Sequence, residues 1–556
     1  MDREQVRLEK RVDRYRDKRK VSISSNRSAQ SIMMRSTVWL TIGNITSRVL
    51  GALYVIPWYK WMGENAHGAQ YLFSKGYNIY ALFLMISTAG IPAAIAKQTA
   101  NYNSLEDYAS SRRLLKQAII VMTFLGIITM ITMFTFSGRF AQGNKDLSSV
   151  IKFLSWVLLI FPAMSVLRGF FQGNNDLMPY AISQILEQII RVGFMLVVTY
   201  YIMIVSNNKD YRLAVILSTF AAFVGVFSSL VILIYFFIKK KHTFFIADNA
   251  EKLAIATNNE STSILIKNMI LQAIPFIFIG CGISIFKLID QFFFEKIMVE
   301  VTDYSIIRIK DIFTLLSPNP DKLVMVIISL GTSMATAGLP LITEKFIKKE
   351  IDSLKDLIIN NIGLFFFVMT PATIGMILIS EPLNTLFYEK SEQGTHLLAL
   401  NCVLGIAMGL FLVCATMLQG LNGNFKAVLY LLLGIITKIL TQYPLIYFLH
   451  EDGAILSSLL GFTIINLFTI YEIYIRTKFN ILSSLKLITR IIVISIGMGI
   501  LLKLIKIMLM KNLDITFKSQ SFYCILIMVV VGVLYYLLVT VKIGLFQKIF
   551  IRRSLK

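Results

Sequence analysis

Apolar stretches of 20 or more residues, separated by short polar breaks, run through most of the chain. A helix needs about 20 apolar residues to cross the hydrocarbon layer of a membrane. The pattern therefore predicts an all-α polytopic membrane protein with about 14 transmembrane helices. The predicted spans are 37–57, 71–95, 117–137, 149–169, 180–204, 213–238, 268–294, 322–343, 357–379, 395–418, 427–449, 454–475, 487–509 and 521–543. Between the seventh and eighth spans, residues 306–316 have the pattern of a short interfacial amphipathic helix.

The composition agrees with a membrane protein. Of the 556 residues, 56% are hydrophobic and 16% are charged, whereas soluble domains have about 45–50% and roughly 25%. The cysteines Cys281, Cys402, Cys414 and Cys524 lie inside apolar stretches without a CxxC pair, which excludes a disulfide framework and a zinc site. The sequence has no Walker A, kinase, zincin or nucleophile-elbow pattern. We therefore expect a transporter without metal or cofactor, and not an enzyme.

The distribution of basic residues predicts the orientation in the membrane. The net charge is +23, and the tail 1–35 holds eleven Lys or Arg against five acids. Further basic residues follow the second, sixth and eighth spans, whereas acidic residues outnumber basic ones in the breaks after the ninth and eleventh spans. Basic loops face the cytoplasm, so both termini of a plasma-membrane protein with an even number of spans are expected there. This explanation of the charge also argues against a nucleic-acid partner.

Two motifs recur at nearly the same offset. Thr88-Ala-Gly-Ile-Pro92 returns as Thr336-Ala-Gly-Leu-Pro340, 248 residues later, and Leu167–Asn174 resembles Leu418–Asn424 at an offset of about 250. Six spans separate the copies, so both copies have the same orientation. This predicts two six-helix lobes related by a pseudo-two-fold axis along the membrane normal, with two extra C-terminal helices.

The repeat suggests boundaries for the parts of the chain. They are a basic cytoplasmic tail (1–35), an N-terminal lobe (36–240), an inter-lobe linker (241–267), a C-terminal lobe (268–476), and the last two helices with a basic C-terminus (477–556). Within the repeated motif, Gly90, Pro92, Gly338 and Pro340 are expected to bend or pack helices, with a hinge role as the alternative.

Ionisable residues deep inside the spans are candidates for a functional site. Each costs at least about 2.5–3.5 kcal/mol in the membrane and usually faces a cavity. They lie in the first, fifth, seventh and eleventh spans, which the repeat relates in pairs: Arg48, Glu187, Arg191, Lys287, Asp290 and Lys438. Four bases and two acids predict a shared, positively charged cavity between the lobes. Such a cavity suits an anion, particularly a phosphate or pyrophosphate.

Structural roles are the alternative for these charges. Glu187 and Arg191 at i,i+4, and Lys287 and Asp290 at i,i+3, could each form a neutral pair on one helix. Lys438 could instead extend toward the membrane surface.

The segments Trp39–Trp58, Gly76–Pro92 and Arg168–Gly173 resemble the YtgP/SpoVB branch of the multidrug/oligosaccharidyl-lipid/polysaccharide flippase superfamily, most closely the MurJ-type lipid II flippases. The resemblance implies a fourteen-helix, two-lobed transporter that works by alternating access. It also implies a cationic central cavity for the pyrophosphate and sugar of an undecaprenyl-linked peptidoglycan precursor. The last two helices would form an apolar groove for the lipid tail.

The resemblance also implies roles for particular residues. Arg48 matches the arginine of the family's first helix, whereas a second arginine of Gram-negative members is Tyr54 in this chain. Asp321-Lys322 partly matches an Asp-Arg pair at the start of the eighth helix, which makes Lys322 a phosphate contact. Lys287 and Lys438 are candidates for the missing role.

Other functions stay open at the level of the sequence. They are export of another undecaprenyl-linked unit for a capsule or a spore cortex, cation-coupled drug antiport on the same fold, and glycosyl transfer by a membrane-embedded enzyme. The expected partners are a lipid-linked anionic substrate, membrane lipids and cell-wall synthesis proteins, with the transporter itself a monomer. The expected driving force is a coupling ion or the membrane potential.

Overall fold

The structure is a computed structural model, and it describes residues 46–47, 49–88, 90–104, 107–174, 176–244, 262–336 and 339–551. This part of the chain is helical and contains no strand. The helices are α2 (Val55–Met62), α3 (Ala66–Thr88), α4 (Ile91–Ser104), α5 (Tyr108–Thr135), α6 (Ser137–Phe140), α7 (Lys145–Gly173), α8 (Leu177–Tyr200), α9 (Tyr211–Phe244), α10 (Thr262–Val301), α11 (Ile306–Leu316), α12 (Pro318–Thr336), α13 (Leu339–Ile347), α14 (Ile351–Leu378), α15 (Ser380–Phe387), α16 (Glu392–Gly420), α17 (Asn424–Thr477), α18 (Ile481–Met510) and α19 (Lys518–Lys542).

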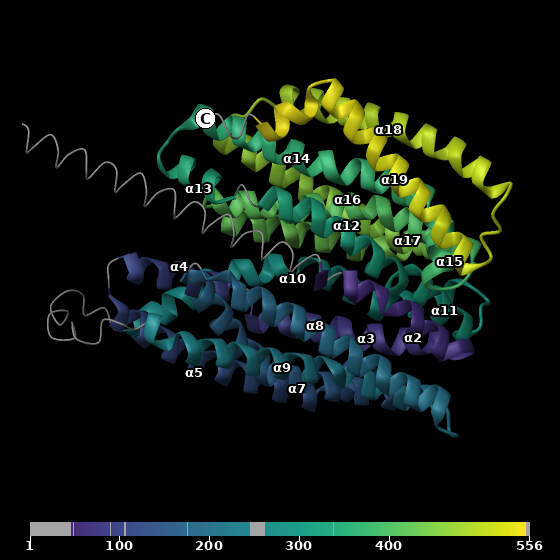
Figure 1. The fold of residues 1–556 in the computed structure, drawn as a ribbon, viewed down its shortest axis with the longest axis horizontal. Coiled ribbons are helices and arrows are strands. Elements are labelled where there is room, and N and C mark those ends of the chain that lie inside the picture. The colour runs from purple at the N-terminus through teal and green to yellow at the C-terminus, as the bar shows by residue number, and fades with distance from the viewer. Residues whose placement is uncertain are drawn as a thin grey trace, which may run out of the picture.

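The helices pack as two groups that lie side by side (Figure 1). The first helix group comprises α2 to α9, and the second comprises α10 to α17. The last two helices, α18 and α19, pack on α14 and α15 of the second group. The groups meet mainly through α2, α3 and α4 on one side and α10, α11, α12 and α15 on the other.

The sequence repeat is visible in the packing. In the first group α7 packs against α3, α4 and α5, and in the second group α16 packs in the same way against α12, α13 and α14. Both α7 and α16 have 29 residues, and they end at Gly173 and Gly420, 247 residues apart. This offset is close to that of the motifs in the sequence, so corresponding segments occupy corresponding places.

The described residues contain 11 helices long and apolar enough to cross a membrane. One of them, α17, corresponds to two predicted spans, because it turns at His450, where φ is 49°. The second predicted span is divided into α3 and α4 at Gly90, whose φ is 77°. Much of the first predicted span lies outside the described residues, so the number fourteen is approximate.

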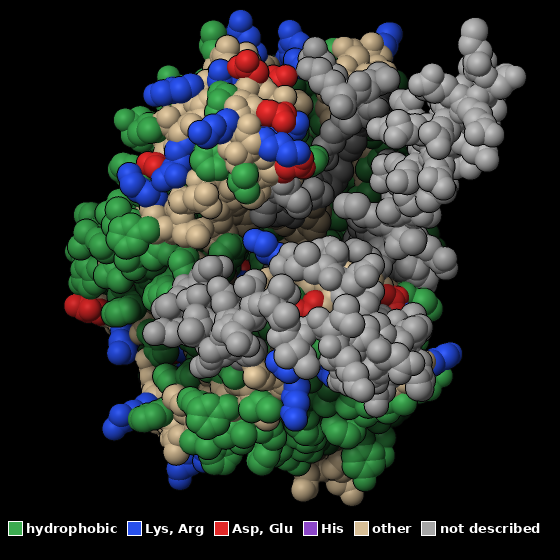
Figure 2. Space-filling model, turned by 90° about the vertical axis from the view of Figure 1, so that its left-hand side faces the viewer, with side chains coloured by type: hydrophobic (Ala, Val, Ile, Leu, Met, Phe, Trp, Pro, Cys, Tyr) green, Lys and Arg blue, Asp and Glu red, His purple; other side chains and the backbone are tan. Residues whose placement is uncertain are grey.

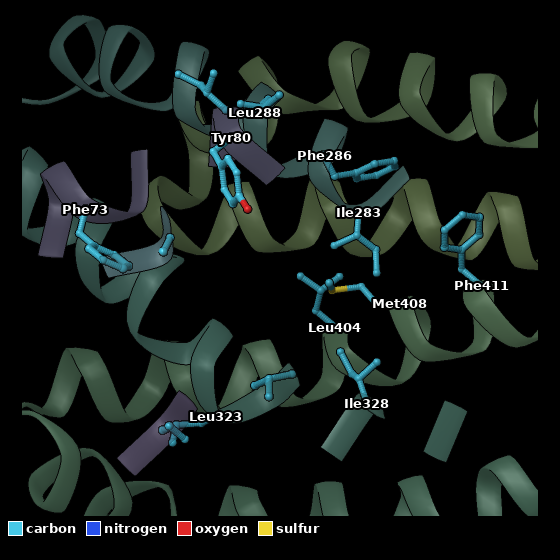
Figure 3. Packing of buried hydrophobic residues seen from close by; sticks show 14 of the residues in the cluster. Phe73, Tyr80, Ile283, Phe286, Leu288, Leu323, Ile328, Leu404, Met408 and Phe411 are labelled. Atoms are coloured by element: carbon cyan, nitrogen blue, oxygen red, sulfur yellow. The ribbon is translucent and has the colours of Figure 1, made fainter. Parts of the chain in front are cut away.

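Apolar side chains fill the interior of each group and also cover its outside. Figure 3 shows part of the interior, where Ile283 and Phe286 of α10 approach Leu404 and Met408 of α16. On the outer surface, large apolar side chains are widely exposed; Phe448 is 74% exposed. Such a surface on helices of this length is typical of contact with lipid.

The two ends of the molecule differ in charge. We call them the α11 end, formed by α2, α11 and α15, and the α4 end, formed by α4 and α13 (Figure 1). Figure 2 shows the α4 end, where many Lys and Arg side chains lie on the surface. The bases predicted to face the cytoplasm belong to this end and include Lys97, Arg112, Arg113, Lys239, Lys240, Lys345 and Lys348. The acidic breaks after the ninth and eleventh spans lie at the other end.

Candidate functional site

Lys322 of α12 reaches across from the second helix group to the first. Its Nζ donates a hydrogen bond to the Tyr54 hydroxyl at 2.6 Å and contacts Oε1 of Gln70 at 3.5 Å. The same Nζ lies 4.6 Å from the ring centroid of Tyr54 and 5.0 Å from that of Phe73. Aromatic faces and neutral oxygens stabilise an ammonium group without cancelling its charge. Among the described residues, no carboxylate forms an ion pair with Lys322, so its neighbours between the groups are neutral oxygens and aromatic rings.

A second cation lies close to Lys322. Arg191 of α8 is within electrostatic range of Lys322 and of the hydroxyls of Tyr54, Tyr77 and Tyr80. Among the described residues, its guanidinium has no hydrogen bond or ion pair. We call Tyr54, Gln70, Phe73, Arg191 and Lys322 the Lys322 site.

The Lys322 site is suited to binding an anion. Two basic side chains come from different helix groups, and neither forms an ion pair with a carboxylate of the described residues. Guanidinium and ammonium groups in a site of low polarity bind phosphate oxygens strongly.

The carboxylate of Glu187 belongs to another arginine. It accepts a hydrogen bond from Nη2 of Arg168 on α7 at 2.8 Å. The buried guanidinium of Arg168 also donates to Ser183 at 3.1 Å and to Ser229 at 2.9 Å. The predicted alternative of a Glu187–Arg191 pair along one helix is therefore not what the structure contains, and Arg191 is left for the Lys322 site.

The charges of the seventh span also pair with other helices. Lys287 lies 2.7 Å from Oδ2 of Asp321 on α12, and Asp290 lies 2.6 Å from Nζ of Lys438 on α17. The self-paired alternative for Lys287 and Asp290 is thus also not observed. Both ion pairs connect helices within the second group.

Lys438 is enclosed in the second helix group and does not face the Lys322 site. Its side chain is fully buried, and besides Asp290 its Nζ donates to the carbonyl of Ala454 and to the hydroxyls of Ser457 and Ser458. A buried ammonium group requires such a set of acceptors. It neither extends to the membrane surface nor converges with Lys322 in this structure.

Some predicted site residues lie outside the described part of the chain. These are Arg48 and Gly338, and Pro340 is placed only as part of α13. Gly90 joins α3 to α4 with a positive φ, and Pro92 follows in the first turn of α4. A Cβ atom on Gly169 of α7 would lie 2.5 Å from the Pro92 carbonyl oxygen, so this glycine permits close packing of α4 on α7.

An apolar groove adjoins the Lys322 site. It has a volume of about 620 Å³ and lies between the helical residues 49–53 and helices α12, α14, α15, α18 and α19. Leu323, next to Lys322, and Leu53, next to Tyr54, line its wall. The hydroxyl of its single tyrosine, Tyr536, donates to the carbonyl of Phe367. The groove therefore offers an apolar surface for a hydrocarbon chain.

The sequence analysis did not single out three charged residues that the structure places between helices. Arg168 is the partner of Glu187, and Lys75 of α3 forms an ion pair with Glu295 of α10. Lys75 and Arg168 lie near the ends of the predicted spans 71–95 and 149–169, and Glu295 follows the span 268–294, so a rule for charges deep inside the spans does not select them.

Comparison with known proteins identifies relatives over almost the whole chain. A family model described as a polysaccharide biosynthesis protein matches residues 33–306. "Lipid II flippase MurJ" of Bacillus subtilis (strain 168) is 34% identical over 546 residues, which cover 94% of this chain and 97% of that protein. Stage V sporulation protein B of the same organism is 25% identical over 174 residues, 31% of this chain and 33% of that protein.

Solved structures of transporters share the fold. A lipid II flippase MurJ in an inward closed conformation matches with a TM-score of 0.61 and 14% identity, over 92% of this chain and 100% of that chain. An outward-facing multidrug transporter of the MATE family and MOP superfamily matches with a TM-score of 0.59 and 16% identity, over 81% and 97%. At these identities the structures establish the fold only.

Proposed function

This chain belongs to the MurJ family of membrane transporters, and we propose that it translocates lipid II, the undecaprenyl-pyrophosphate-linked precursor of peptidoglycan, across the plasma membrane. Its relative of 34% identity carries the name of a lipid II flippase and aligns with almost its full length. The geometry supports the same kind of substrate, because a cationic site and an apolar groove adjoin each other.

In this proposal Lys322 and Arg191 bind the diphosphate. Lys322 exchanges its hydrogen bond to Tyr54 for a phosphate oxygen, and Arg191 supplies a guanidinium that no carboxylate of the described residues occupies. The diphosphate is then held by one cation from each helix group. Tyr54, Tyr77 and Tyr80 offer hydroxyls and ring faces to the sugar.

The groove holds part of the lipid tail. Its wall is apolar, and it begins next to Lys322 and Tyr54. The head can therefore bind between the helix groups while the tail stays in an apolar environment. This arrangement avoids moving the tail through the polar site.

Translocation follows from alternating access. The α4 end, with its basic surface, is the cytoplasmic side, and the α11 end is the external side. No bond is made or broken, so the binding of the head must favour one state over the other. The membrane potential, worth about 2.3 kcal/mol per charge per 100 mV, biases the return.

The observation that carries the proposal is the adjacency of the two-cation site and the groove. The test is a depletion experiment in cells that depend on this chain, in which the fraction of lipid II accessible to a membrane-impermeant reagent is measured. We expect depletion to lower this fraction, and wild-type protein to restore it. Arg191→Ala and Lys322→Ala should fail to restore it, because each removes one of the two phosphate ligands.

A matched control is Lys355→Ala, which removes a lysine from an ion pair with Asp352 at the protein surface. It should restore the accessible lipid II fully. Accumulation of a different undecaprenyl-linked intermediate on depletion would show that the substrate is another polysaccharide unit. Full restoration by the Arg191→Ala, Lys322→Ala double variant would show that the head binds elsewhere.

A further inference from the structure

A partly buried ion pair connects the two helix groups near the α11 end. Lys75 of α3, 4% exposed, forms a salt bridge with Glu295 of α10. The Tyr71 hydroxyl donates to the same carboxylate at 2.6 Å and accepts a hydrogen bond from Lys75 at 2.8 Å. One carboxylate of the second group is thus held by two side chains of the first.

Amide hydrogen bonds extend this contact along the same two helices. Asn78 donates to Oε1 of Gln291 at 3.1 Å, and Nε2 of Gln291 donates to the backbone carbonyl of Lys75 at 3.2 Å. Gln291 and Glu295 are one turn apart on α10, and Tyr71, Lys75 and Asn78 are successive turns of one face of α3. The contact therefore covers about two helical turns.

Aromatic rings enclose the ion pair. The Lys75 Nζ lies 4.5 Å from the ring centroid of Tyr71 and 5.4 Å from that of Phe313 on α11. Tyr71 and Phe313 also make an edge contact at 5.9 Å. Exclusion of water strengthens an ion pair and makes the loss of either partner more disruptive.

A different set of contacts closes the groups at the same end near the groove. There Tyr59 of α2 meets Tyr388, which follows α15, with ring centroids 5.2 Å apart. The Nε1 of Trp58 and the Nε2 of Gln70 are buried nearby without a hydrogen-bond partner in the described residues. Separation of the groups would give these donors access to water or to a polar head, which favours opening.

We propose that Tyr71, Lys75, Asn78, Gln291 and Glu295 form a lock that holds the α11 end closed and must break for the transporter to open there. The proposal concerns the equilibrium between the closed and open states of the α11 end. It rests on the proposed function only in that opening serves transport. The contacts of the lock stabilise the closed state, whereas the buried, unpartnered donors of Trp58 and Gln70 destabilise it. A balance between these contributions makes both closed and open states accessible.

The test measures opening directly in the solubilised full-length protein, without substrate. Asn319→Cys serves as the reporter, because Asn319 is 2% exposed and its carbonyl accepts a hydrogen bond from Tyr388 at the closed end. The rate of its reaction with a hydrophilic maleimide is measured. Protein without the reporter gives the background, since Cys281, Cys402, Cys414 and Cys524 are buried. We expect Lys75→Ala and Glu295→Gln each to raise the rate by about tenfold or more.

The matched control is Lys240→Ala, which breaks the ion pair with Asp176 inside the first helix group. It should leave the reporter rate unchanged. The exchange of charges, Lys75→Glu with Glu295→Lys, should return the rate toward that of the reporter protein alone. Glu295→Gln keeps the shape of the side chain and provides a folded variant if Lys75→Ala does not fold.

Unchanged reporter rates in both single variants would overturn the proposal, as would an equal rise in the Lys240→Ala control. Neither result depends on lipid II. An unchanged fraction of accessible lipid II on depletion of this chain would instead contradict the proposed substrate, whatever the reporter rates, so the two failures can be distinguished.

Discussion

Two arginines lie close to the carboxylate of Glu187, but only Arg168 binds it. Arg168 gains two serine hydroxyls in addition to the carboxylate, and its side chain is almost completely buried. Arg191, one turn from Glu187 on the same helix, stays within its electrostatic range without forming a pair. The structure therefore separates a neutralised arginine, which stabilises the helix group, from an arginine available to an anion.

Because Glu187 pairs with Arg168 and not with Arg191, we expect Glu187 to stabilise the folded protein. Glu187→Gln leaves the buried guanidinium of Arg168 without its counter-charge, and the loss of one partner of a buried pair is worth about 3–5 kcal/mol. We expect a clear fall in the thermal unfolding temperature of the solubilised protein. Replacement of both residues by Met should recover part of the loss, because no charge is then left unpaired. An unfolding temperature of Glu187→Gln equal to wild type would contradict this role.

The deep charges themselves could be predicted from the sequence, but their partners could not. Arg191, Lys287 and Lys438 stand out because each interrupts an apolar stretch. Spacing along one helix offered a Lys287–Asp290 pair as an alternative, whereas the structure pairs Lys287 with Asp321. Such pairs form between helices, and which helix faces approach each other depends on packing that local spacing does not contain.

The break at Gly90 shows how a local motif shapes an element. The φ of 77° at this residue ends α3, and α4 begins one residue later. The second copy of the motif lies where α12 ends at Thr336 and α13 begins at Leu339, and its residues 337–338 lie outside the described part of the chain.

Gly90→Ala is expected to strain this break. A residue with a Cβ at positive φ is disfavoured by about 1–2 kcal/mol, so the unfolding temperature should fall moderately. Gly193→Ala is a suitable control, because Gly193 lies within α8 and a Cβ there meets no atom within 4 Å. That substitution should leave stability unchanged or raise it, since alanine favours a helix. An equal effect of both substitutions would argue against strain at Gly90.

Most elements could be predicted from hydrophobic length, although their ends could not. The span predicted at 149–169 is α7, which extends over Lys145–Gly173, and the segment 306–316 is α11. Helices continue beyond the apolar stretch because a polar first turn remains helical when a side chain caps it. At α7 this cap is Asn144, whose side chain accepts a hydrogen bond from the backbone of Leu147 at 3.1 Å.

The whole molecule combines a repeated pair of helix groups with one unrepeated part, α18 and α19. The repeat made the two groups predictable, because offsets near 248 in the sequence require equivalent structures. The contacts between the groups were not predictable, because Tyr54–Lys322 and Lys75–Glu295 join residues more than 200 positions apart. They also belong to one conformational state of the transporter.

The groove offers a test at this scale. Gly375 lines it, and a Cβ at this position meets no atom within 4 Å, so Gly375→Leu should fill the groove without disturbing the fold. We expect lipid II accessibility to fall while the unfolding temperature stays near wild type, because the tail loses apolar contact area. Gly193→Leu, also in open space but away from the groove, should preserve transport. Normal accessibility with Gly375→Leu would show that the tail lies elsewhere.

The attachment of α18 and α19 to α14 and α15 makes the transporter one-sided. Two repeated helix groups without further helices would present two equivalent sides to the bilayer. Only the side with α18 and α19 has an apolar groove that can bind a polyprenyl chain. In both leaflets the cargo would then arrive and depart along that same flank. We expect an acceptor enzyme that takes the cargo directly to approach from there, leaving the opposite flank to bulk lipid.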